Sequence, residues 1–258
     1  MDEAAEGHYY RTQIGNKNKV IAWSHEARFV KALELIGPGT RRLLDYGCGD
    51  GTLMVMAADR CDEVHGVDVD AHQIADCRTR MGSIENLSFF INEEVAEPGF
   101  DGSYDVVTCM ETLEHCTPPA VESALADVAR LCAPSGRVII SVPIEIGLSF
   151  LVKQSVRAIA KRQYAESYQI LEKYPVRDAA KMLFARRTTE VERFLIGEPP
   201  LVGYSHHGFN WRALRERVSA HLDVDETLFT PLGFLGGLVS SQAYFVCRPK
   251  RRADTHCD

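Results

Sequence analysis

The chain has 258 residues, of which 45% are apolar and 25% are charged, with 19 glycines and 11 prolines. This is ordinary globular composition, and it excludes collagen-like, low-complexity and disulfide-scaffold proteins. Its 29 basic and 36 acidic residues give a formal net charge of −7, so the whole molecule lacks the positive charge that a nucleic-acid backbone attracts. We expect one large α/β domain with an added element.

The eight cysteines are nowhere spaced as Cys-x-x-Cys, and several lie inside apolar runs, where a free thiol behaves as a small apolar side chain. The N-terminal residues are acidic and polar, unlike a secretory signal, and no run of about 18 apolar residues occurs that could span a membrane. We therefore expect a reduced, cytoplasmic protein without a transmembrane segment. Its oligomeric state is left open.

The predicted elements follow a repeating order. An amphipathic helix is expected over residues 25–36, where Gly-Pro-Gly ends it. From residue 41 to 142, short apolar runs alternate with helical stretches, which is typical of βαβ units around a parallel sheet. The expected strands are 42–45, 64–68, 87–91, 104–109 and 137–142, and the expected helices lie near 51–60, 71–81 and 118–132.

After the fifth strand, residues 148–196 have helix-like sequence of a different composition. Ten basic and five acidic residues give this stretch a charge of +5, which leaves −12 on the rest of the chain. A helix over 211–222 and two strands, 226–229 and 242–247, complete the pattern. We expect a core of residues 1–147 and 201–250, a helical lid or insertion over 148–200, and a tail over 251–258.

A glycine loop joins the first strand to the next helix as Asp45-x-Gly47-x-Gly49-x-Gly51. A dinucleotide fingerprint requires Gly-x-Gly-x-x-Gly, and counting from Gly47 its third position is Thr52. This spacing disfavours a nucleotide-linked oxidoreductase, and Asp45 would repel a pyrophosphate. An acid beside the loop instead suits a ligand with a positive amino group, and glycines allow a thioether or sulfonium chain to approach the backbone.

Further polar residues follow the second and third strands. Asp68 ends the second strand, where a carboxylate can accept both hydroxyls of a ribose, while Asp70 is expected to cap the next helix. Asn92 and Glu93 follow the third strand, at a position where a polar side chain can meet an adenine amino group.

In this order, these residues resemble the class I S-adenosylmethionine (SAM)-dependent methyltransferases over about residues 25–142 and the closing strands. The resemblance implies a Rossmann-like, doubly wound α/β fold with a seven-stranded sheet and a helical insertion after strand five. It also implies SAM as cofactor. The residues expected to hold it are Asp45, Gly47, Gly49, Gly51, Asp68, Asn92, Glu93 and Met110.

A cluster of carboxylates and histidines follows the fourth strand. Glu111, Glu114 and His115 are spaced i, i+3 and i+4, so a helix would put them on one face. His206 and His207 follow in a later loop. Two carboxylates and two imidazoles are a ligand set for Mg²⁺ or Mn²⁺, which could lower the pKa of an acceptor hydroxyl.

The run Glu111-x-x-Glu114-His115 resembles that of the ubiquinone-type O-methyltransferases. It is also similar to the small-RNA terminal 2′-O-methyltransferases, whose fourth metal ligand lies in a segment comparable to His207-Gly-Phe-Asn-Trp211. The resemblance implies Glu111, Glu114, His115 and His207 as metal ligands. Two other interpretations stay open: His115 or His207 acts as a metal-free base or acceptor contact, or the segment is a solvated helix start.

The sequence therefore predicts transfer of the SAM methyl group to a small-molecule hydroxyl, lipid-like or sugar-containing, with His115 and His207 as catalytic residues. The alternatives are an RNA 2′-O-methyltransferase with a metal site and a non-catalytic cofactor-binding regulator. The basic insertion is interpreted as a packed amphipathic helix with a solvated face, an anionic-acceptor or RNA-phosphate site, or a peripheral membrane contact. Tyr9, Tyr10 and Arg11 are expected to fold over the cofactor.

Overall fold

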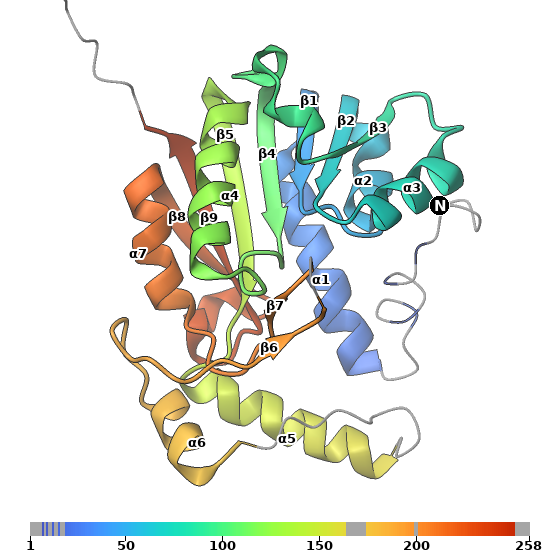
Figure 1. Cartoon of the computed structure of the whole chain (residues 1–258). Helices are drawn as coiled ribbons and strands as arrows, with labels where there is room; N and C mark the ends of the chain where they lie inside the picture. The colour runs from blue at the N-terminus through green and yellow to red at the C-terminus, as the bar shows by residue number, and fades with distance from the viewer. Residues whose placement is uncertain are drawn as a thin grey trace, which may run out of the picture.

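The computed structural model describes residues 7, 9, 12, 15, 19–163, 174–198 and 201–250 (Figure 1). Its centre is a seven-stranded sheet of order β3-β2-β1-β4-β5-β9-β8. The first five strands run parallel, and β9 lies antiparallel between β5 and β8. Their bounds are β1 Thr40–Tyr46, β2 Cys61–Asp68, β3 Leu87–Ile91, β4 Tyr104–Met110, β5 Cys132–Pro143, β8 Leu222–Thr230 and β9 Gln242–Pro249. The predicted Rossmann-like, doubly wound sheet is thus confirmed.

The sheet is buried on both faces, which explains why its parallel strands read as near-continuous apolar runs. On one face, the core is closed by α4 (Pro118–Leu131) and α7 (Trp211–His221). On the other face, it is closed by α1 (Lys19–Ile36), α2 (Thr52–Ala57) and α3 (Ala71–Met81). Strand order reverses between β1 and β4, and such switch points form a crevice at the carboxyl ends of the strands.

Two helix starts follow the expected local chemistry. The side chain of Asp70 accepts hydrogen bonds from the backbone N–H groups of His72 and Gln73, so this residue caps α3 as predicted. Pro118 opens α4, and Thr117 holds the N-cap position without a side-chain capping bond. Four short 3₁₀ helices lie between the larger elements: Ala58–Arg60, Glu94–Ala96, Pro98–Phe100 and Gly233–Leu238.

The segment after β5 is less helical than expected. Its helices are α5 (Leu148–Gln163) and α6 (Val176–Leu183), which lie beyond the edge of the sheet toward which β4 and β5 run (Figure 1). Residues 184–194 are not helical, because Arg186 and Thr189 exchange hydrogen bonds that close a turn: the Arg186 N–H donates to Thr189 Oγ1, and the Thr189 N–H to the Arg186 carbonyl. The prediction of helix throughout 148–196 is wrong here.

A second, two-stranded sheet crosses the expected boundary at residue 200. Its strands, β6 (Leu195–Ile196) and β7 (Gly203–Tyr204), pair antiparallel. The division into a core and a lid over residues 148–200 stays a prediction. In the described part of the chain, no helix combines the length and the apolar character needed to cross a membrane.

Candidate active site

A cavity of about 570 Å³ lies at the carboxyl ends of β1 and β4. Its wall comes from α1, from the loop between β1 and α2, and from the segment that follows β4. Tyr9 and His206 reach it from distant parts of the chain. Of the residues predicted to hold the cofactor, the wall includes Asp45, Gly47, Gly49 and Met110.

The glycine loop has a left-handed backbone conformation, which is energetically unfavourable for residues other than glycine. Gly47, Gly49 and Gly51 all have positive φ, at 80°, 52° and 77°. A Cβ on Gly47 would lie 2.3 Å from Thr112 Oγ1, so this glycine permits a close approach of the loop to the segment after β4. A Cβ on Gly49 would meet nothing within 4 Å. Gly49 therefore leaves an open backbone against which a ligand can lie.

Asp45 lies at the floor of the cavity with 3% of its surface exposed. One carboxylate oxygen accepts a hydrogen bond from Thr108 Oγ1 at 2.7 Å, across the register between β1 and β4. The pKa of this carboxyl is raised from 3.8 to about 7, chiefly by burial; the Thr108 hydrogen bond opposes the rise, and the charge of Asp68 adds to it. Asp45 is therefore poised to ionise when a cationic group arrives.

The other predicted cofactor residues have partners within the protein. The Asp68 carboxylate accepts N–H bonds from Gly49 and Asp70, each at 2.9 Å, and so braces the glycine loop. Asn92 Nδ2 donates to the Tyr46 hydroxyl at 2.9 Å, and Glu93 is exposed ahead of the Glu94–Ala96 helix. These residues and Gly51 are not among those that line the cavity.

The segment after β4 forms a turn rather than the helix on which the i, i+3, i+4 argument depended. Glu111 has a φ of 54°, which is unfavourable for a non-glycine residue and which starts the turn directly after the strand. Its backbone N–H donates to the Ser141 carbonyl at 2.9 Å. The Glu111 carboxylate pairs with Arg28 at 2.8 Å and accepts from Gln242 Nε2 at 3.1 Å. The Glu111 carboxylate therefore binds side chains of α1 and β9.

Glu114, unlike Glu111, is fully buried and has no hydrogen-bond partner for its carboxyl group among the described residues. Burial raises its pKa well above the usual value, and the charge of Glu111 adds to this effect. A buried acid without a partner is unusual and needs an explanation.

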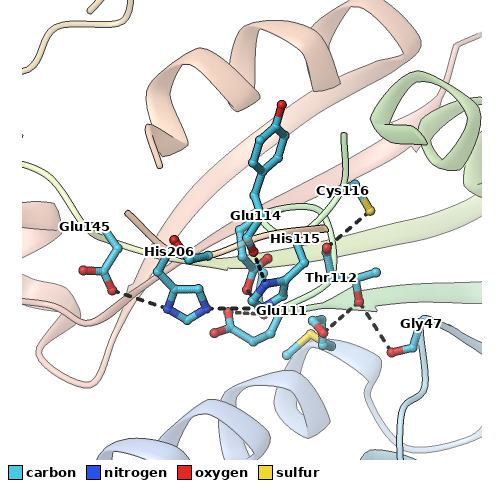
Figure 2. A network of polar contacts seen from close by, with 12 residues as sticks. Gly47, Glu111, Thr112, Glu114, His115, Cys116, Glu145 and His206 are labelled. Atoms are coloured by element: carbon cyan, nitrogen blue, oxygen red, sulfur yellow. Dashed lines mark hydrogen bonds and ion pairs between the residues drawn. The ribbon is translucent and has the colours of Figure 1, made fainter. Parts of the chain in front are cut away.

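Glu114, His115 and His206 together form a compact group, with one potential ligand atom from each residue lying within 4.8 Å of the others. The Nε2 atoms of His115 and His206 are 3.2 Å apart, and His115 Nδ1 lies 2.8 Å from the Tyr204 carbonyl oxygen. Figure 2 shows both rings beside the Glu114 carboxylate. Burial lowers the pKa of His206, which favours the neutral imidazole that binds metals.

The structure does not bring His207 into this group. Its ring is buried and stacked on Tyr174 with centroids 4.6 Å apart, and its Nε2 lies 3.7 Å from an Asp178 carboxylate oxygen. The two histidines open a turn that the Phe209 N–H closes by donating to the His206 carbonyl at 3.1 Å; His206 lines the cavity, whereas His207 packs into the core. The motif comparison indicated His207, whereas His206 is the histidine on the cavity wall.

Among the wall residues that were not predicted from the sequence are His25 and Arg28, and both contact the predicted residue Tyr9. Tyr9 donates its backbone N–H to Asp50 at 2.6 Å, and its hydroxyl lies 2.5 Å from His25 Nδ1. Its hydroxyl also accepts a bond from Arg28. Burial lowers the pKa of His25 to about 4. The Tyr9 contacts agree with a segment that folds over the cavity, whereas Tyr10 and Arg11 lie outside the described residues.

Comparison with known proteins decides the family. A methyltransferase domain model matches residues 43–136. A ubiquinone biosynthesis O-methyltransferase of Burkholderia pseudomallei (strain 1710b) is 31% identical over 190 residues, which cover 73% of this chain and 75% of the relative. This chain belongs to the class I SAM-dependent methyltransferases. A ubiquinone biosynthesis O-methyltransferase of Alkalilimnicola ehrlichii is 40% identical, over 39% of this chain and 41% of its own length.

Solved structures support the same fold. The PH0226 protein of Pyrococcus horikoshii OT3 aligns with a TM-score of 0.58 and 17% identity, over 95% of this chain and 100% of its own. A SAM-dependent methyltransferase from Aquifex aeolicus aligns with a TM-score of 0.53 and 12% identity, over 92% and 98%. At these identities, the likeness concerns the architecture alone.

The site residues of this methyltransferase fit the groups that the family implies. For SAM, the open backbone at Gly49 and the buried acid Asp45 offer a cradle for the chain and a partner for its amino group. For a divalent cation, the unpartnered carboxyl of Glu114 and the two imidazoles offer ligand atoms, and a bound cation would displace the proton that the raised pKa of Glu114 favours.

Proposed function

We propose that this methyltransferase transfers the methyl group of SAM to a hydroxyl group of a small acceptor. The observation that carries the proposal is that Glu114, His115 and His206 lie on the wall of the same cavity as the glycine loop. A donor held at the loop and a hydroxyl held at the cluster would therefore meet within one cavity. The O-methyltransferase relatives support oxygen as the methylated atom.

The cofactor would be held by Asp45, Gly47 and Gly49. Ionised Asp45 would pair with its amino group, and the glycine backbone would lie against its chain. When bound, SAM supplies a methyl group on a positively charged sulfur that is already a strong electrophile. The protein therefore has to align the two reactants, exclude water and remove the acceptor proton.

In this proposal, the cluster of Glu114, His115 and His206 promotes removal of the acceptor proton. Glu114, His115 and His206 would hold a divalent cation, which when bound lowers the pKa of a hydroxyl. A site with one carboxylate and two imidazoles suits Mn²⁺ better than Mg²⁺, because Mg²⁺ prefers oxygen ligands. Glu111 is a weaker candidate ligand than expected from the sequence because Arg28 and Gln242 already occupy its carboxylate.

A metal-free base at His115 is the second candidate for this step, and one contact favours it. The Tyr204 carbonyl can only accept a hydrogen bond, so His115 Nδ1 carries the proton of the neutral ring. Its Nε2 then has the lone pair that could take the acceptor proton, in competition with the His206 Nε2–H group 3.2 Å away. Two results together would favour this candidate: wild-type activity persists after divalent cations are chelated, and His115→Asn abolishes activity.

The acceptor is proposed to be lipid-like, with peripheral membrane contact through the elements after β5. Of 17 large apolar residues that are exposed in the described part of the chain, 14 lie between Leu148 and Leu238. Four exposed basic residues lie on α6 and in the turn that follows it: Arg177, Lys181, Arg186 and Arg187. Apolar side chains bordered by basic ones are typical of surfaces that rest on anionic membranes.

Calorimetry and an acceptor panel test the proposal. We expect SAM and its demethylated product, S-adenosylhomocysteine (SAH), to bind and NAD not to bind. The panel compares phenols and catechols with and without an isoprenoid tail, a sugar and an RNA 3′ end, each with and without EDTA. Turnover of tailed phenols that EDTA suppresses and Mn²⁺ restores would support the full proposal, whereas failure to bind SAM would refute it. Co-flotation with anionic but not neutral vesicles would support membrane contact.

A further inference from the structure

A second buried carboxylate lies behind the histidine cluster. Glu145 follows β5 in the run Ile144–Glu145–Ile146, all of it fully or almost fully buried, and the Glu145 side chain has no exposed surface. An ionised carboxylate in such a place costs several kcal/mol unless it is paired. Lys153 of α5 supplies a partner, with its Nζ 2.8 Å from Glu145 Oε1.

The same oxygen of Glu145 faces the active site. Glu145 Oε1 lies 3.8 Å from His206 Nδ1, and the other nitrogen of that ring, Nε2, lies 3.2 Å from His115 Nε2 (Figure 2). Glu145, His206 and His115 therefore form a row that leads from the buried end of β5 to the wall of the cavity. His206 is the central member of the row, with one nitrogen toward each neighbour.

The positions of the ring protons follow from this row. His115 Nδ1 carries a proton because it faces the Tyr204 carbonyl, so His115 Nε2 has a lone pair when the ring is neutral. Without a cation, the 3.2 Å contact requires His206 Nε2 to be the donor. With a cation, His206 Nε2 must present its lone pair, and the proton of the neutral ring must move to Nδ1, the nitrogen that faces Glu145.

We propose that Glu145 is a positioning residue that stabilises the cation-binding tautomer of His206. A histidine ligand commonly directs its other ring nitrogen toward a carboxylate, which sets its tautomer and orientation and strengthens its binding to the metal. Lys153 offsets the cost of keeping that carboxylate ionised, and so connects α5 to the site. The inference rests on the proposed cation site at Glu114, His115 and His206.

A Glu145–Lys153 pair with a purely structural role would respond differently to substitution of Glu145. If Glu145 served only to anchor α5 through Lys153, its replacement by the isosteric Gln would lower stability and leave cation affinity unchanged. If Glu145 selects the tautomer, the same replacement weakens the binding of a cation by the 10- to 100-fold typical of lost outer-shell carboxylates, because neutral Gln is a poorer acceptor for His206 Nδ1–H. SAH binding reports whether the variant has kept its fold.

The experiment titrates Mn²⁺ into wild-type protein, Glu145→Gln and Glu122→Gln, following free Mn²⁺ by electron paramagnetic resonance. Glu122 is a matched control because its carboxylate lies 2.7 Å from His221 Nε2 in an exposed pair that is not part of the cavity wall. We expect at least tenfold weaker Mn²⁺ binding for Glu145→Gln, unchanged binding for Glu122→Gln, and SAH affinity within twofold for both.

A second measurement needs no variant at residue 145. In wild-type protein loaded with diamagnetic Zn²⁺, long-range ¹H–¹⁵N spectra assigned with His206→Gln should show the His206 proton on Nδ1. Equal Mn²⁺ affinity of wild type and Glu145→Gln, or a proton on Nε2 in the loaded protein, would overturn the role of Glu145 alone. Failure of the wild type to bind Mn²⁺ at all would overturn the cation site and this inference with it.

Discussion

The guanidinium of Arg28 lies 2.8 Å from the carboxylate of Glu111, and this ion pair joins α1 to the turn that follows β4. The side chains of both residues are largely buried, with 6% and 17% of their surfaces exposed. Arg28 also donates to the Tyr9 hydroxyl, and its carbonyl accepts a bond from Tyr244 at 2.7 Å. The pair thus connects the first helix and the N-terminal segment to the turn that carries Glu114 and His115.

Removal of one member of this pair should be costly. Arg28→Met leaves the buried Glu111 charge without its main partner, and breaking a buried ion pair in this way costs about 3–5 kcal/mol. We expect a loss of about 3 kcal/mol in the free energy of unfolding, measured by urea denaturation at pH 7. Lys31→Ala is the matched control, because it removes an exposed i, i+3 pair with Glu34 and should cost about 0.5 kcal/mol or less. Equal losses in the two variants would contradict the role of Arg28.

Cofactor binding should depend on pH through Asp45. Burial raises the pKa of Asp45 to about 7, and pairing with a ligand ammonium group requires the ionised form. Below pH 7, binding must first remove a proton from Asp45, so SAH affinity should fall about tenfold between pH 7.0 and 5.5. An α-amino group, with a pKa of about 7.7–8.0, stays protonated over this range. Calorimetric titration at several pH values measures the effect.

Asp45→Asn is the companion variant. It should weaken SAH binding at pH 7.5 and make the remaining affinity independent of pH between 5.5 and 7.0. Because the pKa of Asp45 is higher in the folded protein than in the unfolded chain, ionisation of this group opposes folding as pH rises from about 4 through 7. The Asn variant should therefore unfold at higher urea concentration than wild type at pH 8. A steep pH dependence in Asp45→Asn would place the titrating group elsewhere.

The parallel strands and the glycine loop were predictable because their signals are local. Buried strands such as β1 and β4 read as continuous apolar runs, and a loop that needs positive φ at Gly47, Gly49 and Gly51 leaves its glycines in the sequence. The cap of α3 at Asp70 is a local signal of the same kind. Each of these features depends on residues within a few positions of one another.

The rest of the site depends on long-range packing, which has no local signal. Arg28 and Glu145 reach the site from α1 and from beyond β5, and the site residues that they face, Glu111 and His206, are far from them in the sequence. The i, i+3, i+4 spacing of Glu111, Glu114 and His115 predicted a helix, but the chain turns at Glu111 with positive φ. Which of His206 and His207 faces inward depends on how the loop packs against Tyr174 of the insertion.

Two glycines of the loop should respond differently to alanine. Gly47→Ala combines a φ of 80° with a Cβ 2.3 Å from Thr112 Oγ1, and should cost about 2–4 kcal/mol of stability. Gly49→Ala meets no neighbour within 4 Å and should cost only about 1 kcal/mol for its backbone. Its methyl group would nevertheless occupy ligand space, so SAH affinity should fall at least tenfold. Urea denaturation and calorimetry measure the two effects.

Gly37→Ala is the control for the stability lost when alanine is placed at a backbone position with positive φ. Gly37 follows α1, has a φ of 79° and also has open space around a built Cβ. It should match Gly49→Ala in lost stability and leave SAH affinity unchanged. If Gly49→Ala binds SAH as tightly as Gly37→Ala does, the ligand does not lie against this part of the loop.

The two adjacent histidines offer the sharpest test of the site. His206→Gln removes an imidazole from the cavity wall, so it should weaken Mn²⁺ binding at least tenfold with little change in stability. His207→Gln removes a buried ring that stacks on Tyr174 and lies against Phe194, so it should cost about 1–2 kcal/mol of stability and leave Mn²⁺ affinity unchanged. Electron paramagnetic resonance of free Mn²⁺ measures the change in affinity, and urea denaturation measures the change in stability.

The reverse pattern would mean that the loop presents His207 to the cavity, as the comparison with His207-Gly-Phe-Asn-Trp211 indicated. Because the two residues are neighbours and the substitution is the same, any general effect of the variant on the loop is shared and cancels in the comparison.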